Sequence, residues 1–153
     1  MKTYRSLAEI QKAIASGNIT CKQLVEQYLQ VINEKSHLNV FLEVFAEEAL
    51  AKADVVDEKI RAGRQGRLAG MVISLKDVLC YKGHKLQAGS RILEGFVSQF
   101  TGTAVQRLLD EDAIIIGRTN CDEFAMGSSS ENSAYGPVVN AAGEKRVPGG
   151  SSG

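Results

Sequence analysis

Hydrophobic residues near the start of the chain recur at the spacing of an amphipathic helix. Leu7, Ile10 and Ile14 are three or four positions apart, which places them on one helical face. Ser6 followed by Glu9 forms a capping box just ahead of this stripe, and a glycine follows where a helix end is expected. The pattern therefore predicts a short first helix.

Two further helices are predicted before position 63. Thr20 and Gln23 repeat the capping box ahead of a second apolar stripe, so a second helix is expected to end near Ser36. Residues 46–62 carry apolar side chains at helical spacing among many charges, which predicts a third helix ending at Gly63. Residues 1–63 are thus predicted to form an N-terminal helical layer.

The periodicity changes after Gly63. Residues 68–75 form a short, mostly apolar run with β-branched residues, which predicts a buried strand that ends at Lys76. Residues 81–101 show no clear period and are expected to form a long ordered loop with about one helical turn. A helix opened by Thr103 and then a second apolar strand at 113–117 follow.

Strand, helix and strand in this order, with apolar strands, predict an α/β sheet covered by helices on both faces. Residues 64–153 would form the first part of that α/β core. At this length one domain is the default, so the helical layer and the core are expected to belong to the same domain.

Composition excludes several classes of protein. The 153 residues have 44% hydrophobic content and a formal net charge of zero, so no basic excess favours nucleic acid or anionic membrane. No apolar run is long enough for a membrane span or a signal peptide, which predicts a cytoplasmic protein. The three cysteines lie far apart without a ligand pattern, so neither a disulfide framework nor a zinc site is expected.

Three segments carry candidate chemistry. They are V-I-S-L-K-D, in which Lys76 ends the first strand, N-C-D-E-F-A-M-G-S-S at 120–129, and R-V-P-G-G-S-S-G at 146–153. Taken alone, the segment at 146–153 is as typical of a flexible linker as of a functional motif. A phosphate-binding loop is disfavoured because the chain lacks G-x-x-x-x-G-K-[ST].

In order and spacing, these three segments together resemble the amidase-signature family over nearly the whole chain. The resemblance implies a mixed sheet covered by helices and assigns Lys76 as the strand-end catalytic lysine. It implies that Ser151 is a catalytic serine preceded by a cis peptide at Gly150, and that Ser128 and Ser129 line the substrate pocket. For Ser128 and Ser129 a simple Gly/Ser turn is the alternative. The nucleophilic serine would lie roughly two dozen residues beyond Ser151, so these 153 residues alone are expected to be inactive.

The chemistry explains why these residue types belong together. A serine hydroxyl is a weak nucleophile unless a base removes its proton, and a lysine amine is such a base only when burial lowers its pKa from about 10.4. Ser151 could relay the proton from the nucleophile to Lys76. The alternative for Lys76 is an exposed strand-end lysine that pairs with Asp77.

Within the family, residues 122–140 are similar to the characteristic stretch of the glutaminase subunit of tRNA-dependent amidotransferases. That similarity implies glutamine hydrolysis that supplies ammonia for transamidation of Glu-tRNA(Gln). It also implies a heterotrimer with subunits B and C, in which the partner uses ATP and Mg, with no cofactor in this chain. Residues 140–146 depart from the expected stretch, so a stand-alone small-molecule amidase remains an alternative. If the natural product ends at Gly153, a non-catalytic assembly module is the interpretation from another class.

Two remaining features have ordinary interpretations. Asp122 and Glu123 are adjacent, and adjacent carboxylates rarely converge on one substrate atom, so they are expected to cap a helix containing Phe124 and Met126. His84 lies in the long loop without a matching carboxylate or cysteine pattern. It is expected to be a surface histidine, with a general base as the alternative.

Overall fold

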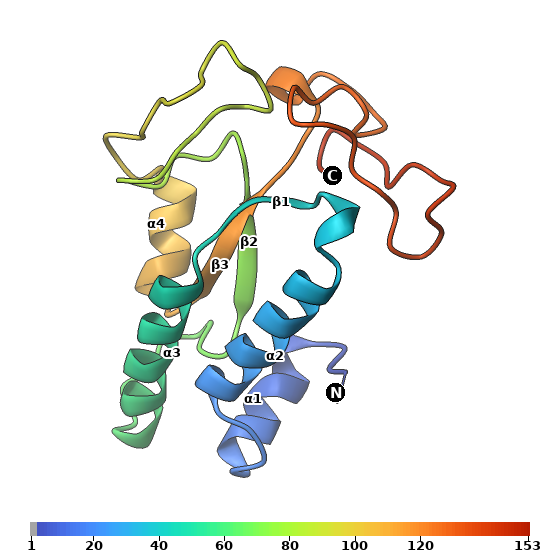
Figure 1. Ribbon diagram of the computed structural model, residues 1–153. Coiled ribbons are helices and arrows are strands. Elements are labelled where there is room, and N and C mark those ends of the chain that lie inside the picture. The colour runs from blue at the N-terminus through green and yellow to red at the C-terminus, as the bar shows by residue number, and fades with distance from the viewer. Residues whose placement is uncertain (1–2) are drawn as a thin grey trace. The chain divides into compact units, whose positions relative to one another are not determined.

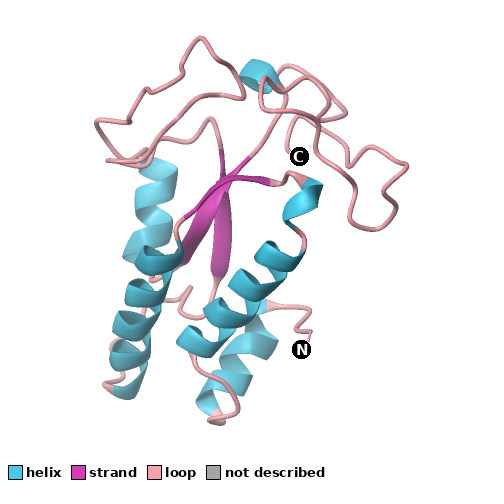
Figure 2. Cartoon of the chain, in the orientation of Figure 1, coloured by secondary structure: helices cyan, strands magenta, loops and turns pink. Residues whose placement is uncertain are grey.

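The computed structural model describes residues 3–153 (Figure 1). The chain divides into two compact units, neither of which is continuous in sequence. Unit 1 contains the residues up to Glu34, then Phe45–Ile73 and Gln106–Ile116, and unit 2 contains Lys35–Val44, Ser74–Val105 and Gly117–Gly153. Figure 2 shows the helices and strands together with the long loops that connect them.

Three helices of unit 1 confirm the predicted amphipathic pattern: α1 (Leu7–Ala15), α2 (Cys21–Glu34) and α3 (Ala46–Arg61). At α1, the Ser6 hydroxyl accepts from the Glu9 N–H at 3.2 Å. At α2 the capping box is reciprocal, because Thr20 and Gln23 each accept the other's backbone N–H through their side chains. Local sequence therefore determines where both helices begin.

Long-range contacts fix the same helices in place within unit 1. Ala13, Ile19 and Leu24 form a buried cluster, against which Val72 packs. Helices α2 and α3 pack against each other. The Asp57 carboxylate on α3 accepts the backbone N–H groups of Cys21 at 2.8 Å and of the next residue at 3.1 Å. The first turn of α2 is thereby capped from its neighbour.

The sheet has three strands in the order β1-β3-β2 (Figure 1). They are β1 (Phe41–Val44), β2 (Val72–Lys76) and β3 (Ile114–Thr119), and α4 (Thr103–Asp110) lies between β2 and β3 in sequence. Strand β1 runs antiparallel to β3. The Ile114 N–H donates to the Met71 carbonyl, and the Asp77 N–H donates to the Thr119 carbonyl. Residue numbers therefore increase in the same direction along both strands, so β2 and β3 are parallel. The predicted α/β fold with a mixed sheet is confirmed.

The burial of the central strand, β3, explains why its apolar sequence predicted it correctly. Ile114, Ile115 and Ile116 are all buried. Because successive side chains point to opposite faces of a sheet, burial of three in a row means that both faces are covered at this point. The continuous apolar run is therefore the expected sequence of a central strand.

Two features of the sheet differ from the prediction. Strand β1 was not expected, because Phe-Leu-Glu-Val is only four residues long and lies between stronger helical patterns. Strand β2 begins at Val72, not at Leu68, and it is not the buried strand that was expected, because Leu75 is its one buried residue and Ser74 is exposed. The preceding residues turn instead: the Met71 N–H bonds to the Leu68 carbonyl at 2.8 Å, and Gly70 has φ +89°, outside the range of a strand.

Unit 2 is built mainly from loops. The predicted long loop is confirmed, but the helical turn expected in it does not form. No helix or strand occurs between β2 and α4 in the described chain, and Lys85 and Val97 form an isolated antiparallel bridge there. Single 3₁₀ turns lie at Ser36–Leu38 (η1) and Glu123–Ala125 (η2). None of the helices in residues 3–153 is long and apolar enough to cross a membrane.

Candidate active site

Lys76 and Ser151 are in direct contact within unit 2. Lys76 is the last residue of β2, and its Nζ donates to Ser151 Oγ at 2.5 Å. Both residues are half-buried. The peptide bond between Gly150 and Ser151 is cis, as expected. The structure therefore brings together the two residues that the resemblance assigned to catalysis.

The segment that follows β3 holds Ser151 through its backbone. Cys121 and Ser152 form an antiparallel bridge, and the Asp122 N–H donates to the Ser151 carbonyl at 3.0 Å. Since β3 is parallel to β2, which ends at Lys76, this bridge places the serine segment at the end of the sheet where that lysine lies.

Asp122 organises the loop that carries the candidate substrate-binding serines. Its side chain is fully buried, and its carboxylate accepts the N–H groups of Ser130 at 3.0 Å and Asn132 at 3.1 Å. Burial by itself would raise the pKa of Asp122, but these N–H groups, with those of Ser129 and Glu131, hold the pKa below its usual range. The expected helix-capping role is wrong, because the side chain of Asp122 makes no capping bond to η2 and binds the loop instead.

Two glycines allow the chain to close around this carboxylate. A Cβ on Gly127 would lie 2.3 Å from Asp122 Cγ, and a Cβ on Gly150 would lie 2.4 Å from Asp122 Oδ2. Both distances are far below van der Waals contact, so only glycine fits at either position. The glycine before Ser151 is thus required by packing against Asp122.

Ser128 and Ser129 lie beside the same glycine. The Ser129 backbone nitrogen would be 2.5 Å from a Cβ on Gly150, and the Ser128 carbonyl carbon would be 2.6 Å from it. Ser128 is exposed and Ser129 is half-buried. The structure therefore brings both predicted substrate-binding residues next to the segment that carries Ser151.

Asp77, the neighbour of Lys76, is engaged elsewhere. Its buried carboxylate forms an ion pair with the Arg118 guanidinium and accepts the N–H groups of Gln87 at 3.0 Å and Gly89 at 2.8 Å. Its backbone N–H donates to the Thr119 carbonyl at 3.0 Å. In the described part of the chain, the ion-pair partner of Asp77 is Arg118 and the side-chain partner of Lys76 is Ser151, so the alternative pairing of Lys76 with Asp77 does not occur.

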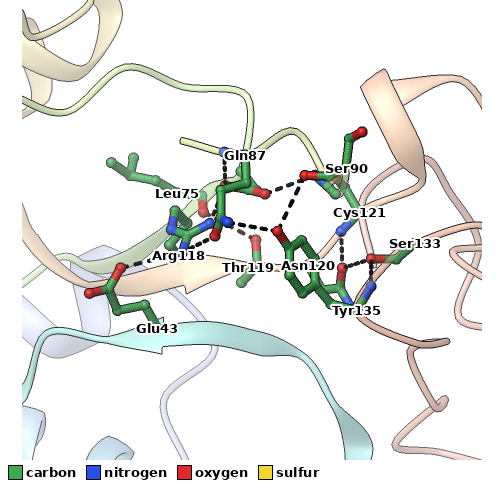
Figure 3. Close-up of polar contacts among 12 residues, drawn as sticks. Glu43, Leu75, Gln87, Ser90, Arg118, Thr119, Asn120, Cys121, Ser133 and Tyr135 are labelled. Carbon is green, nitrogen blue, oxygen red and sulfur yellow. Dashed lines mark hydrogen bonds and ion pairs between the residues drawn. The ribbon is translucent and has the colours of Figure 1, made fainter. Parts of the chain in front are cut away.

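Arg118 is itself surrounded by acceptors (Figure 3). Its Nη2 donates to Glu43 Oε2 and to Gln87 Oε1, each at 3.3 Å. The amide of Gln87 continues the network, because its Nε2 donates to the Tyr135 hydroxyl at 2.6 Å. An arginine on the central strand is therefore held by Glu43 of β1, by Asp77 and by Gln87 of the long loop.

Asn120 anchors a second polar cluster, also drawn in Figure 3. Its Oδ1 accepts from the Ser133 hydroxyl at 2.6 Å and from the Cys121 N–H at 2.9 Å. Its Nδ2 donates to the Gly136 carbonyl at 3.1 Å. Because Asn120 is fully buried, this cluster ties the start of the C-terminal segment to residues 133–136.

The other residues weighed from the sequence lie outside this constellation. The His84 ring stacks on Tyr81 with centroids 4.1 Å apart, and His84 is half-buried in the long loop. All three cysteines are free. Burial is the main cause that raises the pKa of the Cys121 thiol, with Asp77 contributing, so this thiol beside the site is held in its neutral form.

Sequence reasoning missed the roles of Asp77, Arg118 and Asp122. One signal could have indicated them: an arginine that follows Ile-Ile-Ile-Gly on a buried strand requires an anionic partner, because an unpaired buried charge is costly. The partner's identity depends on which residue the parallel strand brings alongside, and sequence alone does not give that.

The model of the amidase family, described as Amidase, matches residues 23–153. The chain belongs to the amidase family. Similar proteins include the glutamyl-tRNA(Gln) amidotransferase A chain of Chlorobaculum parvum, 47% identical over 98% of this chain and 31% of the relative. Its counterpart from Chlorobaculum tepidum is 46% identical over 98% of this chain and 31% of its own. The chain thus spans about a third of these relatives, matching their N-terminal portion.

Solved structures of amidases share this fold. One, described as part of a vestigial protein complex that reveals the origins of an s-triazine catabolic enzyme, superposes with a TM-score of 0.90 at 34% identity, over 97% of this chain and 33% of that one. Native peptide amidase from Stenotrophomonas maltophilia gives a TM-score of 0.87 at 29% identity, over 98% and 32%. The chain accordingly has the amidase-signature fold over the portion that it covers.

Proposed function

We propose that the full-length protein is the glutamine-hydrolysing subunit of a tRNA-dependent amidotransferase. Its ammonia would convert Glu-tRNA(Gln) to Gln-tRNA(Gln) on a partner subunit that uses ATP and Mg. The identity of 44–47% to glutamyl-tRNA(Gln) amidotransferase relatives over nearly the whole chain supports the assignment. The observation that carries the chemistry is the 2.5 Å contact between Lys76 Nζ and Ser151 Oγ.

In the proposed mechanism, Lys76 and Ser151 activate a serine that the family resemblance expects beyond residue 153. That serine attacks the carboxamide carbon of glutamine, and its proton passes to Ser151 Oγ while the Ser151 proton passes to Lys76 Nζ. The tetrahedral intermediate collapses when the protonated amine returns a proton, by the same path, to the departing nitrogen. Ammonia leaves, and water then hydrolyses the acyl-enzyme to glutamate.

The contact supports both directions of this relay. With a charged amine, Lys76 donates to Ser151 Oγ; with a neutral amine, the same distance allows the Ser151 hydroxyl to donate to Nζ. Ser128 and Ser129 would bind the substrate, since their backbone lies beside Gly150.

The proposal is tested on the full-length protein, with and without its partner subunits. We expect ammonia release from L-glutamine, and Gln-tRNA(Gln) formation when partner subunits, ATP and Mg are added. A strain that lacks the protein would fail to charge tRNA(Gln) correctly. Ammonia release without any effect on tRNA charging would contradict the amidotransferase assignment.

A stand-alone small-molecule amidase is the second candidate. The similarity to peptide amidase from Stenotrophomonas maltophilia, at a TM-score of 0.87, favours it. Such an enzyme would hydrolyse small amides without partner subunits, and its loss would impair amide utilisation. The candidate from another class stays the non-catalytic assembly module, which would bind partner subunits and hydrolyse neither glutamine nor a small amide.

A further inference from the structure

We propose that Arg118 is a positioning residue for Lys76: its guanidinium pairs with the carboxylate of Asp77 and thereby leaves the Lys76 amine to Ser151. The inference deepens the proposed function, since it takes Lys76 as the catalytic base. Lys76 is the last residue of β2 and Asp77 follows it, and an uncompensated anion close to the base would favour the charged form of the amine.

The contacts show that Asp77 and Lys76 have different partners. The Asp77 side chain is 0% exposed and that of Arg118 is 5% exposed, so neither charge is compensated by water. The two carboxylate oxygens of Asp77 are taken by Arg118, by the Gln87 N–H and by the Gly89 N–H. Lys76 Nζ instead contacts Ser151 Oγ.

The guanidinium is held so that it faces Asp77. Nη1 contacts Asp77, whereas Nη2 is shared between Glu43 and Gln87 at 3.3 Å each. The Glu43 side chain is 38% exposed, so solvent weakens its attraction for Arg118 relative to that of the buried Asp77. A planar donor with this fork of contacts is fixed more firmly than a lysine would be.

Two other titratable groups of unit 2 near this cluster, Asp122 and Cys121, have their own stabilising surroundings. Asp122 is neutralised in part by four backbone N–H groups, and the Cys121 thiol is kept neutral mainly by burial. Asp77 accepts two backbone N–H groups, and the cation that compensates its charge is Arg118. The charged and titratable groups of this cluster are Glu43, Lys76, Asp77, Arg118, Cys121, Asp122 and Tyr135.

Removing the cation should change the pH dependence of the reaction. With Arg118→Gln, Asp77 remains a buried anion without its ion-pair partner and next to Lys76 in the chain, so the amine should stay protonated to higher pH. In full-length protein we expect the acid-side midpoint of kcat/KM for ammonia release from L-glutamine to rise by about one pH unit or more. Activity at neutral pH should fall accordingly and recover partly at high pH.

A second substitution separates charge from structure. Adding Asp77→Asn to Arg118→Gln replaces the buried ion pair with two neutral amides of similar shape, so the midpoint should return to the parent's value. The exposed Arg64→Gln is the matched control and should leave the profile unchanged. A fall in activity at all pH values with an unshifted midpoint, or a double variant that keeps the shift, would overturn the inference.

Chemical labelling of Lys76 tests the role of Arg118 without an activity assay, so its result can be told apart from a failure of the proposed function. Acetic anhydride labels neutral amines, and mass spectrometry can compare Lys76 with the exposed Lys85 in the same molecule. Arg118→Gln should reduce labelling of Lys76 relative to Lys85, and the double variant should restore it. If the parent releases no ammonia, the proposed function fails, while equal labelling in all three proteins would refute the role of Arg118.

Discussion

Lys76 and Ser151 are 75 positions apart in the sequence, yet Lys76 Nζ donates to Ser151 Oγ at 2.5 Å. Two structural features bring them together. The parallel strands β2 and β3 place Lys76 and the Cys121 segment at one end of the sheet, and the Cys121–Ser152 bridge then aligns the serine. The pair is thus a product of sheet topology as much as of the two side chains.

Substitution of the glycine next to Ser151 should be costly. A Cβ at Gly150 would lie 2.4 Å from Asp122 Oδ2 and 2.5 Å from the Ser129 nitrogen, so either the serine segment or the loop must shift. We expect Gly150→Ala to lower the free energy of unfolding by about 1–3 kcal/mol and to abolish ammonia release. Urea denaturation and a glutaminase assay measure the two effects.

Gly143→Ala is the control for that substitution. A Cβ there has Arg146 Cδ as its nearest neighbour, at 3.6 Å, which is ordinary contact. It should change neither stability nor activity appreciably. Parent-like activity in Gly150→Ala would mean that the close approach to Asp122 is not required.

Asp122 should make stability depend on acid. Its folded pKa lies below the ordinary value because backbone N–H groups outweigh the opposing effect of burial. Its stabilisation is therefore complete above the unfolded pKa of about 3.9 and is lost as pH falls through the folded pKa. Asp122→Asn should be less stable than the parent at pH 7, and the difference should shrink as pH falls below about 4.

Urea midpoints measured across that pH range test the prediction, with the exposed Asp110→Asn as the reference. A constant difference between parent and Asp122→Asn at every pH would show that the charge of Asp122 is not what stabilises the 128–132 loop.

The first turn of α2 gives a prediction for unit 1. The Asp57 carboxylate accepts the N–H groups of Cys21 and Lys22 at 2.8 and 3.1 Å, so Asp57→Ala leaves two helix-end donors without this partner. We expect a loss of about 1–2 kcal/mol in unfolding free energy. Asp54→Ala, one turn earlier, removes only an exposed ion pair with Lys22 and should cost less than about 0.5 kcal/mol. Equal losses would contradict the capping role.

The sequence predicted correctly those helices and strands that are determined by residues close together in the chain. The capping boxes at Ser6 and Thr20 marked the starts of α1 and α2, and the run Ile114–Ile116 marked a strand buried on both faces. Strand β1 escaped prediction because its pairing with β3, which is what makes it a strand, is a long-range contact. The turn at Gly70 that shortens β2 is local, closed by the hydrogen bond from Met71 to Leu68, and it was missed because it lies inside an otherwise apolar run.

In the candidate site, too, contacts between residues far apart in the chain could not be predicted from local sequence. Family resemblance indicated Lys76, Ser151 and the 128–129 serines, and the structure brings them near one another. The role of Asp122 was misjudged because a carboxylate before a short turn is typical of a cap, whereas its partners lie eight to ten residues further on. The Asp77–Arg118 pair joins two strands and has no local pattern.

The most direct test of the proposed mechanism is ammonia release from L-glutamine by the full-length protein carrying Lys76→Ala or Ser151→Ala. Lys85→Ala and Ser36→Ala, both at exposed positions, serve as matched controls. The relay predicts activity in the parent and the controls, with a loss of at least about a hundredfold in kcat for each site variant. Full activity in either site variant would contradict the assigned role of that residue.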